Sequence, residues 1–470
     1  MLFNSISFLL FFPIVCILYY CISSKLVGVR NVVLLLASYY FYMNWEPVYA
    51  LLIMFSSFTT WLFSIAISRY DNTKKRKWFL YACLICNLSI LFTYKYLNFF
   101  TESVFGLLEL GGVRMEVPHF ELLLPVGISF YTFQAIGYTI DVYRRSIAPE
   151  RNFLTYALFV SFFPQLVAGP IERARNLLPQ FHQIHRFNSE ECIEGLKMMI
   201  WGFFMKLCIA ENVASYVNAV YNNLPNHTGT SVLLATFFFT FQIFCDFGGY
   251  SLIAIGTARC LGFRLMQNFN HPYLSYSPKE FWRRWHISLS SWFADYVYIP
   301  LGGSRCSEGK HQRNLLLTML VSGVWHGANW TFIMWGGIHG VLLCANSLFE
   351  KRIKKMRSNV FTIILTFLLM SFCWIFFRAN SLNDAYLAIN KILFHQGHLF
   401  NGSGKPSIVL PILLIGVLMF KEIKDEYSKT PLKFMHHANP WVSALWTALM
   451  IVVVLMCAQF EGGQFIYFQF

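Results

Sequence analysis

His326 is the ionisable residue in the least expected surroundings. It interrupts the stretch NLLLTMLVSGVWHGANWTFIMWGG, residues 314–337, which is otherwise mostly apolar, small or aromatic. A polar side chain without a partner in such surroundings costs roughly 1–3 kcal/mol or more. Desolvation disfavours imidazolium, and a neutral imidazole can take a proton from an attacking hydroxyl group. His326 is therefore a candidate general base, with a hydrogen-bonded packing role as the competing interpretation.

The elements around His326 predict a hairpin that enters the membrane part-way. A helical limb from Arg313 reaches Trp325 after ~20 Å at the rise of an α-helix, which is short for a hydrocarbon layer of ~30 Å. Gly327 can break the helix, and a second limb from Asn329 can return. Broken backbone at that depth needs protein or a water-filled cavity around it. The residues expected to line a pocket at this apex are Trp325, Gly327, Asn329 and Trp330.

A second histidine, His286, lies in the basic and aromatic stretch KEFWRRWHISLSSWFADYVYIPLGG, residues 279–303. One interpretation is an amphipathic helix in the plane of the membrane, with indole rings at the interface. The other is a site in which cations draw the phosphates of a nucleotide-type donor to the cytoplasmic side of the pocket. The residues proposed for this donor-binding role are Lys279, Arg283, Arg284 and Arg305.

The composition is that of a polytopic membrane protein. Of 470 residues, 56% are hydrophobic and only 13% charged, and apolar runs long enough to span a bilayer recur along the whole chain. The formal net charge of +14 is gathered in short runs between these spans, which is typical of cytoplasmic loops and not of a nucleic-acid surface. Placing these runs inside predicts extracytoplasmic N- and C-termini. The twelve cysteines lie mostly inside apolar runs, so neither disulfides nor a metal site is expected.

One carboxylate, Asp246, falls inside an apolar stretch. Intramembrane carboxylates are candidates for function by default. Gln242 lies one turn before Asp246 and two glycines follow it. A structural hydrogen bond to a neighbouring helix therefore explains this residue as well as chemistry does.

The two histidine stretches resemble the membrane-bound O-acyltransferase (MBOAT) family, in particular its bacterial branch for alginate O-acetylation and teichoic acid D-alanyl transfer. The resemblance runs in order along nearly the whole chain. It is carried by FWRRWHISLSSWFADYVYIPLGG and SGVWHGANWTFIMWGGIHG, and upstream by LPVGISFYTFQAIGYTIDVYRR, FFPQLVAGPIERARNLLPQF, GFFMKLCIAEN and QIFCDFGGYSLIAIG.

The resemblance implies an all-α bundle of about 10–13 transmembrane or re-entrant helices around a central funnel. It implies one membrane domain over residues 1–470, with a re-entrant catalytic region at 258–357 and an extracytoplasmic tail at 458–470. His326 matches the catalytic histidine of the family, and His286 matches the second motif histidine in a supporting role. Tyr467, in the aromatic end FIYFQF, matches a proposed acyl acceptor and relay, although aromatic residues there could simply anchor the chain at the interface.

The implied function is O-acetylation of an exported, alginate-like polysaccharide at the bacterial inner membrane. The donor would be cytoplasmic acetyl-CoA, with no bound cofactor or metal, and an extracytoplasmic SGNH-type acetyltransferase would be the partner. Two alternatives remain at this point. One is a transporter or flippase for a polysaccharide precursor, although no second copy of the His326 hairpin is evident. The other is an acyltransferase whose acceptor is a lipid or a protein.

Overall fold

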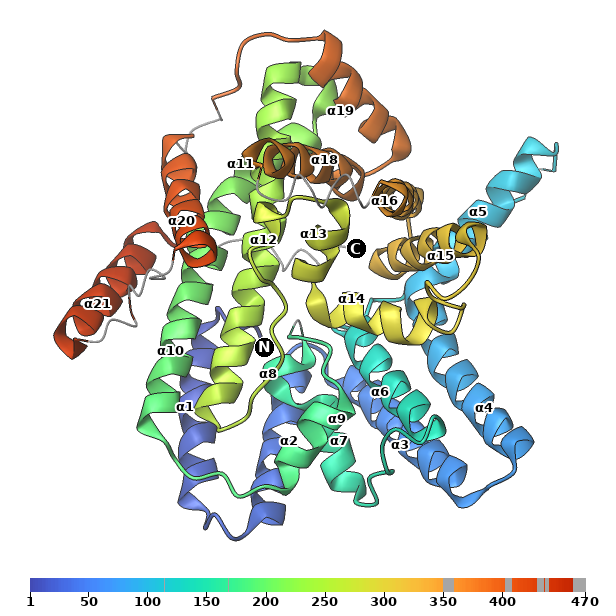
Figure 1. Cartoon of the computed structure of the whole chain (residues 1–470), viewed down its shortest axis with the longest axis vertical. Coiled ribbons are helices and arrows are strands. Elements are labelled where there is room, and N and C mark those ends of the chain that lie inside the picture. The colour runs from blue at the N-terminus through green and yellow to red at the C-terminus, as the bar shows by residue number, and fades with distance from the viewer. Residues whose placement is uncertain are drawn as a thin grey trace. The chain divides into compact units, whose positions relative to one another are not determined.

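The structure, a computed structural model, is all-α over the residues that it describes (Figure 1). These are residues 1–470 without 114, 168, 350–358, 402–407, 429–434, 436–438 and 460–470. Contacts group them into two compact units, each built from two pieces of chain. The first unit is Met1–Cys192 with Thr257–Met266, and the second is Ile193–Gly256 with Gln267–Phe470. The expected all-α class is confirmed, whereas the single domain and the central funnel stay predictions.

Six of the described helices are long and apolar enough to cross a membrane. They are Pro47–Arg69, Thr73–Leu110, Gly229–Cys260, Trp330–Leu348, Val360–Arg378 and Pro440–Cys457. Two shorter apolar helices, Ile6–Cys21 and Val27–Met43, begin the chain. A chain with this many apolar helices is a polytopic membrane protein.

The first unit is held by hydrogen bonds between apolar helices. Its helices are α1 (Ile6–Cys21), α2 (Val27–Met43), η1 (Pro47–Tyr49), α3 (Ala50–Arg69), α4 (Thr73–Leu91), η2 (Phe92–Tyr96), α5 (Leu97–Leu110), α6 (Ile128–Tyr143), α7 (Phe153–Ser161), α8 (Phe163–Leu166), α9 (Ala174–Leu177) and η3 (Leu178–His182). The Tyr156 hydroxyl donates to Thr60 Oγ1 at 2.8 Å, and Ser56 Oγ donates to Asn87 Oδ1 at 2.7 Å. Such pairs satisfy polar groups where water is excluded.

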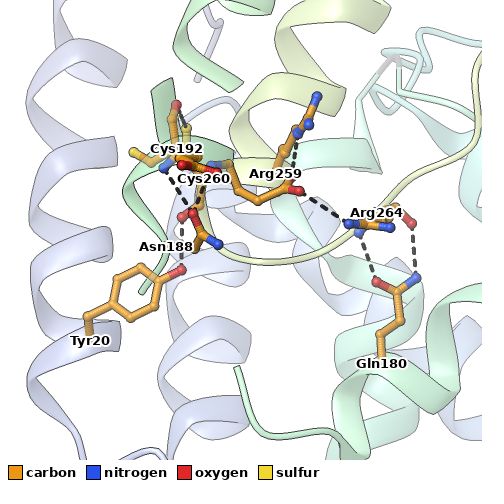
Figure 2. A network of polar contacts seen from close by, with 9 residues as sticks. Tyr20, Gln180, Asn188, Cys192, Arg259, Cys260 and Arg264 are labelled. Carbon is orange, nitrogen blue, oxygen red and sulfur yellow. Dashed lines mark hydrogen bonds and ion pairs between the residues drawn. The ribbon is translucent and has the colours of Figure 1, made fainter. Parts of the chain in front are cut away.

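Polar contacts also join the two pieces of the first unit (Figure 2). The Glu191 carboxylate accepts from Arg259 Nε at 2.6 Å and from Arg264 Nη2 at 3.2 Å. The Gln180 side chain pairs with both backbone groups of Arg264, and the Tyr20 hydroxyl donates to the Cys260 carbonyl at 2.9 Å. These bonds fix the segment that follows the long helix ending at Cys260.

The second unit contains both histidine stretches. Its helices are α10 (Ser189–Phe203), η4 (Phe204–Ala210), α11 (Glu211–Tyr221), η5 (Leu224–Asn226), α12 (Gly229–Cys260), η6 (Pro272–Leu274), α13 (Pro278–Arg284), α14 (Ile287–Phe293), η7 (Ala294–Tyr298), α15 (Glu308–His326), α16 (Trp330–Leu348), α18 (Val360–Arg378), α19 (Leu382–Phe394), α20 (Val409–Tyr427) and α21 (Pro440–Cys457). The first few residues of α10 and the last turn of α12 belong to the first unit. Helices α10 and α11 are joined through η4, a π-helical turn, so the chain is helical without a break from 189 to 221.

The hairpin around His326 is present as α15 and α16. Its first limb begins at Glu308 instead of Arg313, so it has 19 residues and extends about 28 Å. The limbs lie backbone against backbone, because a Cβ at Gly323 would come within 2.3 Å of the Phe332 carbonyl oxygen. A Cβ at Gly336 would likewise lie 2.5 Å from the Met319 carbonyl oxygen. Glycine at these positions sets the close approach, while the depth of the hairpin in a membrane stays a prediction.

Candidate active site

His326 is the last residue of α15 and lies in a cage of aromatic rings. Its ring centroid is 4.9 Å from that of Trp325, 4.9 Å from that of Trp335 and 5.3 Å from that of Phe377. Only 3% of its surface is exposed. The turn that follows cannot carry a side chain at Gly327, because a Cβ there would lie 2.2 Å from the Phe332 ring. The sequence around His326 therefore fixes the imidazole at the turn of the hairpin.

The remaining residues predicted to line the pocket complete this turn. Asn329 is the N-cap of α16, and its side-chain oxygen accepts from the Thr331 backbone N–H at 2.9 Å. Asn329 Nδ2 also donates to the Asn380 carbonyl at 3.1 Å. The next residue, Trp330, is 52% exposed. Trp325 and Gly327 thus lie in the buried part of the turn, whereas Trp330 lies on its exposed side.

His286 lies close to Trp325, the same indole that His326 contacts. The ring centroids of His286 and Trp325 are 6.0 Å apart, so the two histidines contact the same indole. His286 is fully buried and lies between α13 and α14, outside the candidate spans. Burial lowers the pKa of its imidazole to about 3, so the ring is neutral at physiological pH. Its backbone is left-handed, with φ of 42°, a conformation that a non-glycine residue adopts at a cost and that is common at functional sites.

Asn268 holds this strained turn in place. Its backbone carbonyl accepts from Ile287 N at 2.9 Å, and its side-chain oxygen accepts from Ser288 Oγ at 2.7 Å and Ser288 N at 3.3 Å. Its side-chain amide donates to Ser251 Oγ on α12 at 3.1 Å. Because these hydrogen bonds hold the two residues that directly follow His286, we assign Asn268 as a positioning residue. Sequence reasoning missed it, because nothing in QNFNHPY indicates a partner 20 residues away.

Replacing Asn268 with alanine is expected to lower the turnover rate about tenfold or more with little change in donor affinity, because small displacements of catalytic groups are costly. Steady-state kinetics of acyl transfer by the purified variant check this. The matched control is Asn87→Ala in the first unit, where a buried asparagine also bonds a serine. Equal turnover loss per folded molecule in both variants would mean that Asn268 has only a structural role.

A third histidine, His339 on α16, is part of the same cluster and was also missed. Its ring centroid lies 4.7 Å from that of Trp335, which in turn contacts His326. Trp282 Nε1 donates to His339 Nδ1 at 3.3 Å. Among the described residues, His339 Nε2, Trp335 Nε1 and Trp374 Nε1 are buried without a hydrogen-bond partner. Such groups cost about 1–3 kcal/mol each unless something polar meets them, which fits a site for a polar ligand or water.

A cavity of about 390 Å³ ends beside this cluster. Its walls are mostly apolar, as in typical ligand sites. They include Ser322, one helical turn before His326, and Trp282, the partner of His339. Two cationic residues, Lys279 and Arg283, also line it. The cavity therefore joins a pair of cationic side chains to the neighbourhood of the predicted base.

The four residues predicted to bind the donor are not in equivalent positions. Arg283 is exposed and lines the cavity with Lys279. Arg284 instead forms ion pairs with Glu280 at 2.8 Å and Glu426 at 2.7 Å. Arg305 is exposed in the connection before α15 and is not among the residues that line the cavity. The structure thus brings Lys279 and Arg283 together, whereas the charge of Arg284 is already balanced.

Asp246 has an ionic partner that the sequence analysis did not name. Lys206, on η4, donates to Asp246 Oδ1 at 2.5 Å and to Glu211 Oε1 at 3.3 Å. All three side chains are buried. A lysine within an apolar helix was a signal available in GFFMKLCIAEN. Of the two interpretations left open for Asp246, the geometry favours the structural contact between neighbouring helices.

Tyr467 lies outside the described residues. The last described residue, Gln459, is bonded to the start of α11 and to η4. Its side chain donates to Asn212 Oδ1 at 2.9 Å, and its backbone N–H donates to the Leu207 carbonyl at 3.2 Å. The chain therefore leaves the described part of the protein beside the buried Lys206.

Comparison with known proteins shows the family of the chain. Residues 145–383, which include both histidines, match the model of the membrane-bound O-acyltransferase family. The chain is 40% identical to "Probable alginate O-acetylase AlgI" of Pseudomonas aeruginosa over 390 residues, covering 82% of this chain and 74% of that protein. It is 36% identical to the protein of that name in Pseudomonas putida over 499 residues, covering all of both chains. It is 34% identical to "Peptidoglycan O-acetyltransferase" of Helicobacter pylori, covering 77% of this chain and 74% of that protein.

The apolar helices and these comparisons define a membrane acyl-transfer enzyme. The chain belongs to the membrane-bound O-acyltransferase family. It is a multi-pass membrane protein and an O-acyltransferase, and its relatives support a membrane O-acetyltransferase.

Proposed function

We propose that the protein takes an acetyl group from cytoplasmic acetyl-CoA and passes it across the bacterial inner membrane for O-acetylation of an exported, alginate-like polysaccharide. The observation that carries the proposal is the position of His326 at a hairpin turn, one helical turn from a cavity lined by two cationic residues. Two relatives are named alginate O-acetylase and peptidoglycan O-acetyltransferase. These names support transfer of an acetyl group and a polysaccharide as the acceptor. In this proposal both chain termini lie outside the cytoplasm.

Lys279 and Arg283 would bind the phosphates of the donor, while the apolar cavity holds its pantetheine arm. The thioester would then lie towards Ser322 and the His326 cage. His326 is nearly buried, so the reacting groups reach it when the aromatic side chains around it shift. Trp282 is the wall residue that connects the cavity to the cage through His339.

The first acyl acceptor would be the hydroxyl group of Tyr467. Its oxygen attacks the thioester carbonyl carbon while the His326 imidazole takes the phenolic proton. The carbon–sulfur bond breaks, and the thiolate of CoA receives that proton from the imidazolium. The products are an O-acetyl tyrosine and CoA. An SGNH-type partner outside the membrane would then move the acetyl group to sugar hydroxyls.

Incubation of the purified protein in lipid nanodiscs with radiolabelled acetyl-CoA tests the proposal. We expect label in the peptide that contains Tyr467, and none in the Tyr467→Phe variant. When the partner is added, the label should move to the partner and to an uronate polymer. Label on a lipid, or flux of a polysaccharide precursor without acetyl transfer, would instead support one of the alternative functions.

Replacing Arg283 with glutamine is expected to raise KM for acetyl-CoA about fivefold at nearly constant turnover, because an exposed ion pair contributes about 1 kcal/mol or less. The matched control is an acetylated pantetheine without phosphates, whose KM should be the same for both proteins. Steady-state kinetics measure KM of the unmodified protein and of the variant for each of the two donors. Equal KM increases for both donors would show that Arg283 does not recognise phosphate.

A further inference from the structure

Arg378, the last residue of α18, is a cation held only by neutral groups. Its Nη2 donates to Asn218 Oδ1 at 2.8 Å and to Asn222 Oδ1 at 3.0 Å. Its guanidinium carbon lies 5.3 Å from the centre of the Tyr221 ring. In the part of the chain that the structure describes, Arg378 forms no ion pair with a carboxylate. By contrast, Arg284 and Arg259 have carboxylate partners.

These neutral contacts orient the guanidinium without cancelling its charge. A third, longer contact of 3.5 Å joins Nη1 to Asn380 Oδ1. A guanidinium has five N–H donors, so two remain for a ligand after these three contacts. We refer to Arg378, Asn218, Asn222 and Asn380 as the Arg378 cluster. An oriented cation with spare donors is suited to bind an anion.

The Arg378 cluster is connected to the turn that holds the predicted base. Phe377, the residue before Arg378, contacts the His326 ring. The Asn380 carbonyl accepts from Asn329 Nδ2, and Asn329 is followed by the exposed indole of Trp330. A ligand on this cluster would therefore lie beside the hairpin turn. If the basic run 351–357 is cytoplasmic, as the charge pattern predicts, α18 runs outward and its C-terminal end faces the acceptor side.

We propose that the Arg378 cluster binds a carboxylated sugar, that is, a uronate residue of the acceptor polysaccharide. This inference rests on the proposed function. The remaining Nε–H and Nη1–H of the guanidinium can each donate a charge-assisted hydrogen bond to a carboxylate oxygen, and asparagine amides both donate to and accept from sugar hydroxyls. The exposed Trp330 ring offers an apolar face for the pyranose ring. The competing explanation, a cation that only stabilises the C-terminal end of a helix, requires no ligand.

Binding of a hexamer of a uronic acid to the full-length protein in nanodiscs tests the proposal without any acyl donor. Arg378→Gln is expected to raise Kd about tenfold or more, because a hydrogen bond to a charged group is lost. A neutral hexasaccharide should bind more weakly to the unmodified protein and should not distinguish it from the variant. Binding of the uronate should also weaken with added salt.

Asn222→Asp provides a second test that keeps Arg378 in the chain. The new carboxylate would pair with the guanidinium and compete with the sugar, so Kd should rise by a similar factor. Arg264→Gln, at an exposed arginine of the first unit, is the matched control and should leave Kd unchanged. The proposal fails if either cluster variant binds the hexauronate like the unmodified protein. It also fails if those variants lose binding of a protein partner while sugar binding persists.

The two proposals can fail separately. Sugar binding is measured without acetyl-CoA, so a protein that binds the uronate but transfers no acetyl group would overturn only the proposed function. A protein that transfers acetyl groups normally, with uronate binding insensitive to Arg378, would overturn only the sugar site.

Discussion

Replacing His326 with alanine is expected to reduce acetyl transfer at least 10²- to 10⁴-fold, the range that a general base contributes. The imidazole is at the turn of the α15–α16 hairpin, one helical turn from Ser322 in the wall of the cavity. Among the described residues of this cluster, the other imidazoles are those of His286, which contacts Trp325, and His339, which contacts Trp335. The loss should appear in turnover more than in donor affinity.

Two comparisons separate chemistry from folding in this experiment. His326→Asn keeps a polar side chain in the aromatic cage and should be as inactive as the alanine variant. His311→Ala removes a histidine near the start of the same helix, and it should transfer acetyl groups normally. Thermal unfolding of each purified variant reports whether the hairpin is intact. Acetyl transfer within twofold of the unmodified rate in a folded His326→Ala protein would refute the assignment of the base.

The second large effect is expected at Lys206. Lys206→Met removes the cation that lies between Asp246 and Glu211 and leaves two carboxylates in a buried site. Breaking a buried ion pair by removing one partner typically costs about 3–5 kcal/mol of stability. We therefore expect a much lower yield of folded protein and a lower midpoint in a thermal unfolding scan.

The loss of stability in Lys206→Met should come from the two unpaired carboxylates and not from the missing lysine side chain itself. The triple variant Lys206→Met, Asp246→Asn, Glu211→Gln removes all three charges and should recover much of the stability. Lys197→Met, which breaks a partly exposed pair with Glu194 on α10, should change stability by about 1 kcal/mol or less. A triple variant as unstable as the single one would mean that Lys206 acts through packing instead of charge.

The sequence predicts those parts of the fold and site that depend on local pattern. Apolar runs predict the all-α membrane class, and Gly327 after a helix of limited length predicts the hairpin around His326. Asn268, His339 and Lys206 were not predicted, because each acts through a residue far away in the chain. Asn268 bonds Ser288 and Ser251, His339 accepts from Trp282, and Lys206 pairs with Asp246.

The same limit explains why the four predicted donor cations separate in the structure. The sequence shows four cationic residues within 27 positions, but it does not show which carboxylates form ion pairs with them. The Arg284–Glu280 pair spans one helical turn, so it could have been predicted from the sequence. The pair of Arg284 with Glu426, 142 residues later, could not have been predicted in this way. Only the fold shows that Arg283 lines the cavity, whereas Arg284 is paired with two carboxylates.

The contact of Gly323 with Phe332 and of Gly336 with Met319 has a mechanical consequence. The two helices touch through their main chains at these positions, so no layer of side chains lies between them that could slide or rotate. The hairpin should therefore move as one rigid unit. If the donor is the proposed thioester, its entry must then come from motion of the cavity walls that face the hairpin, with the Trp282 indole as the first candidate. The cavity walls could then differ between relatives while the His326 imidazole stays in the same position.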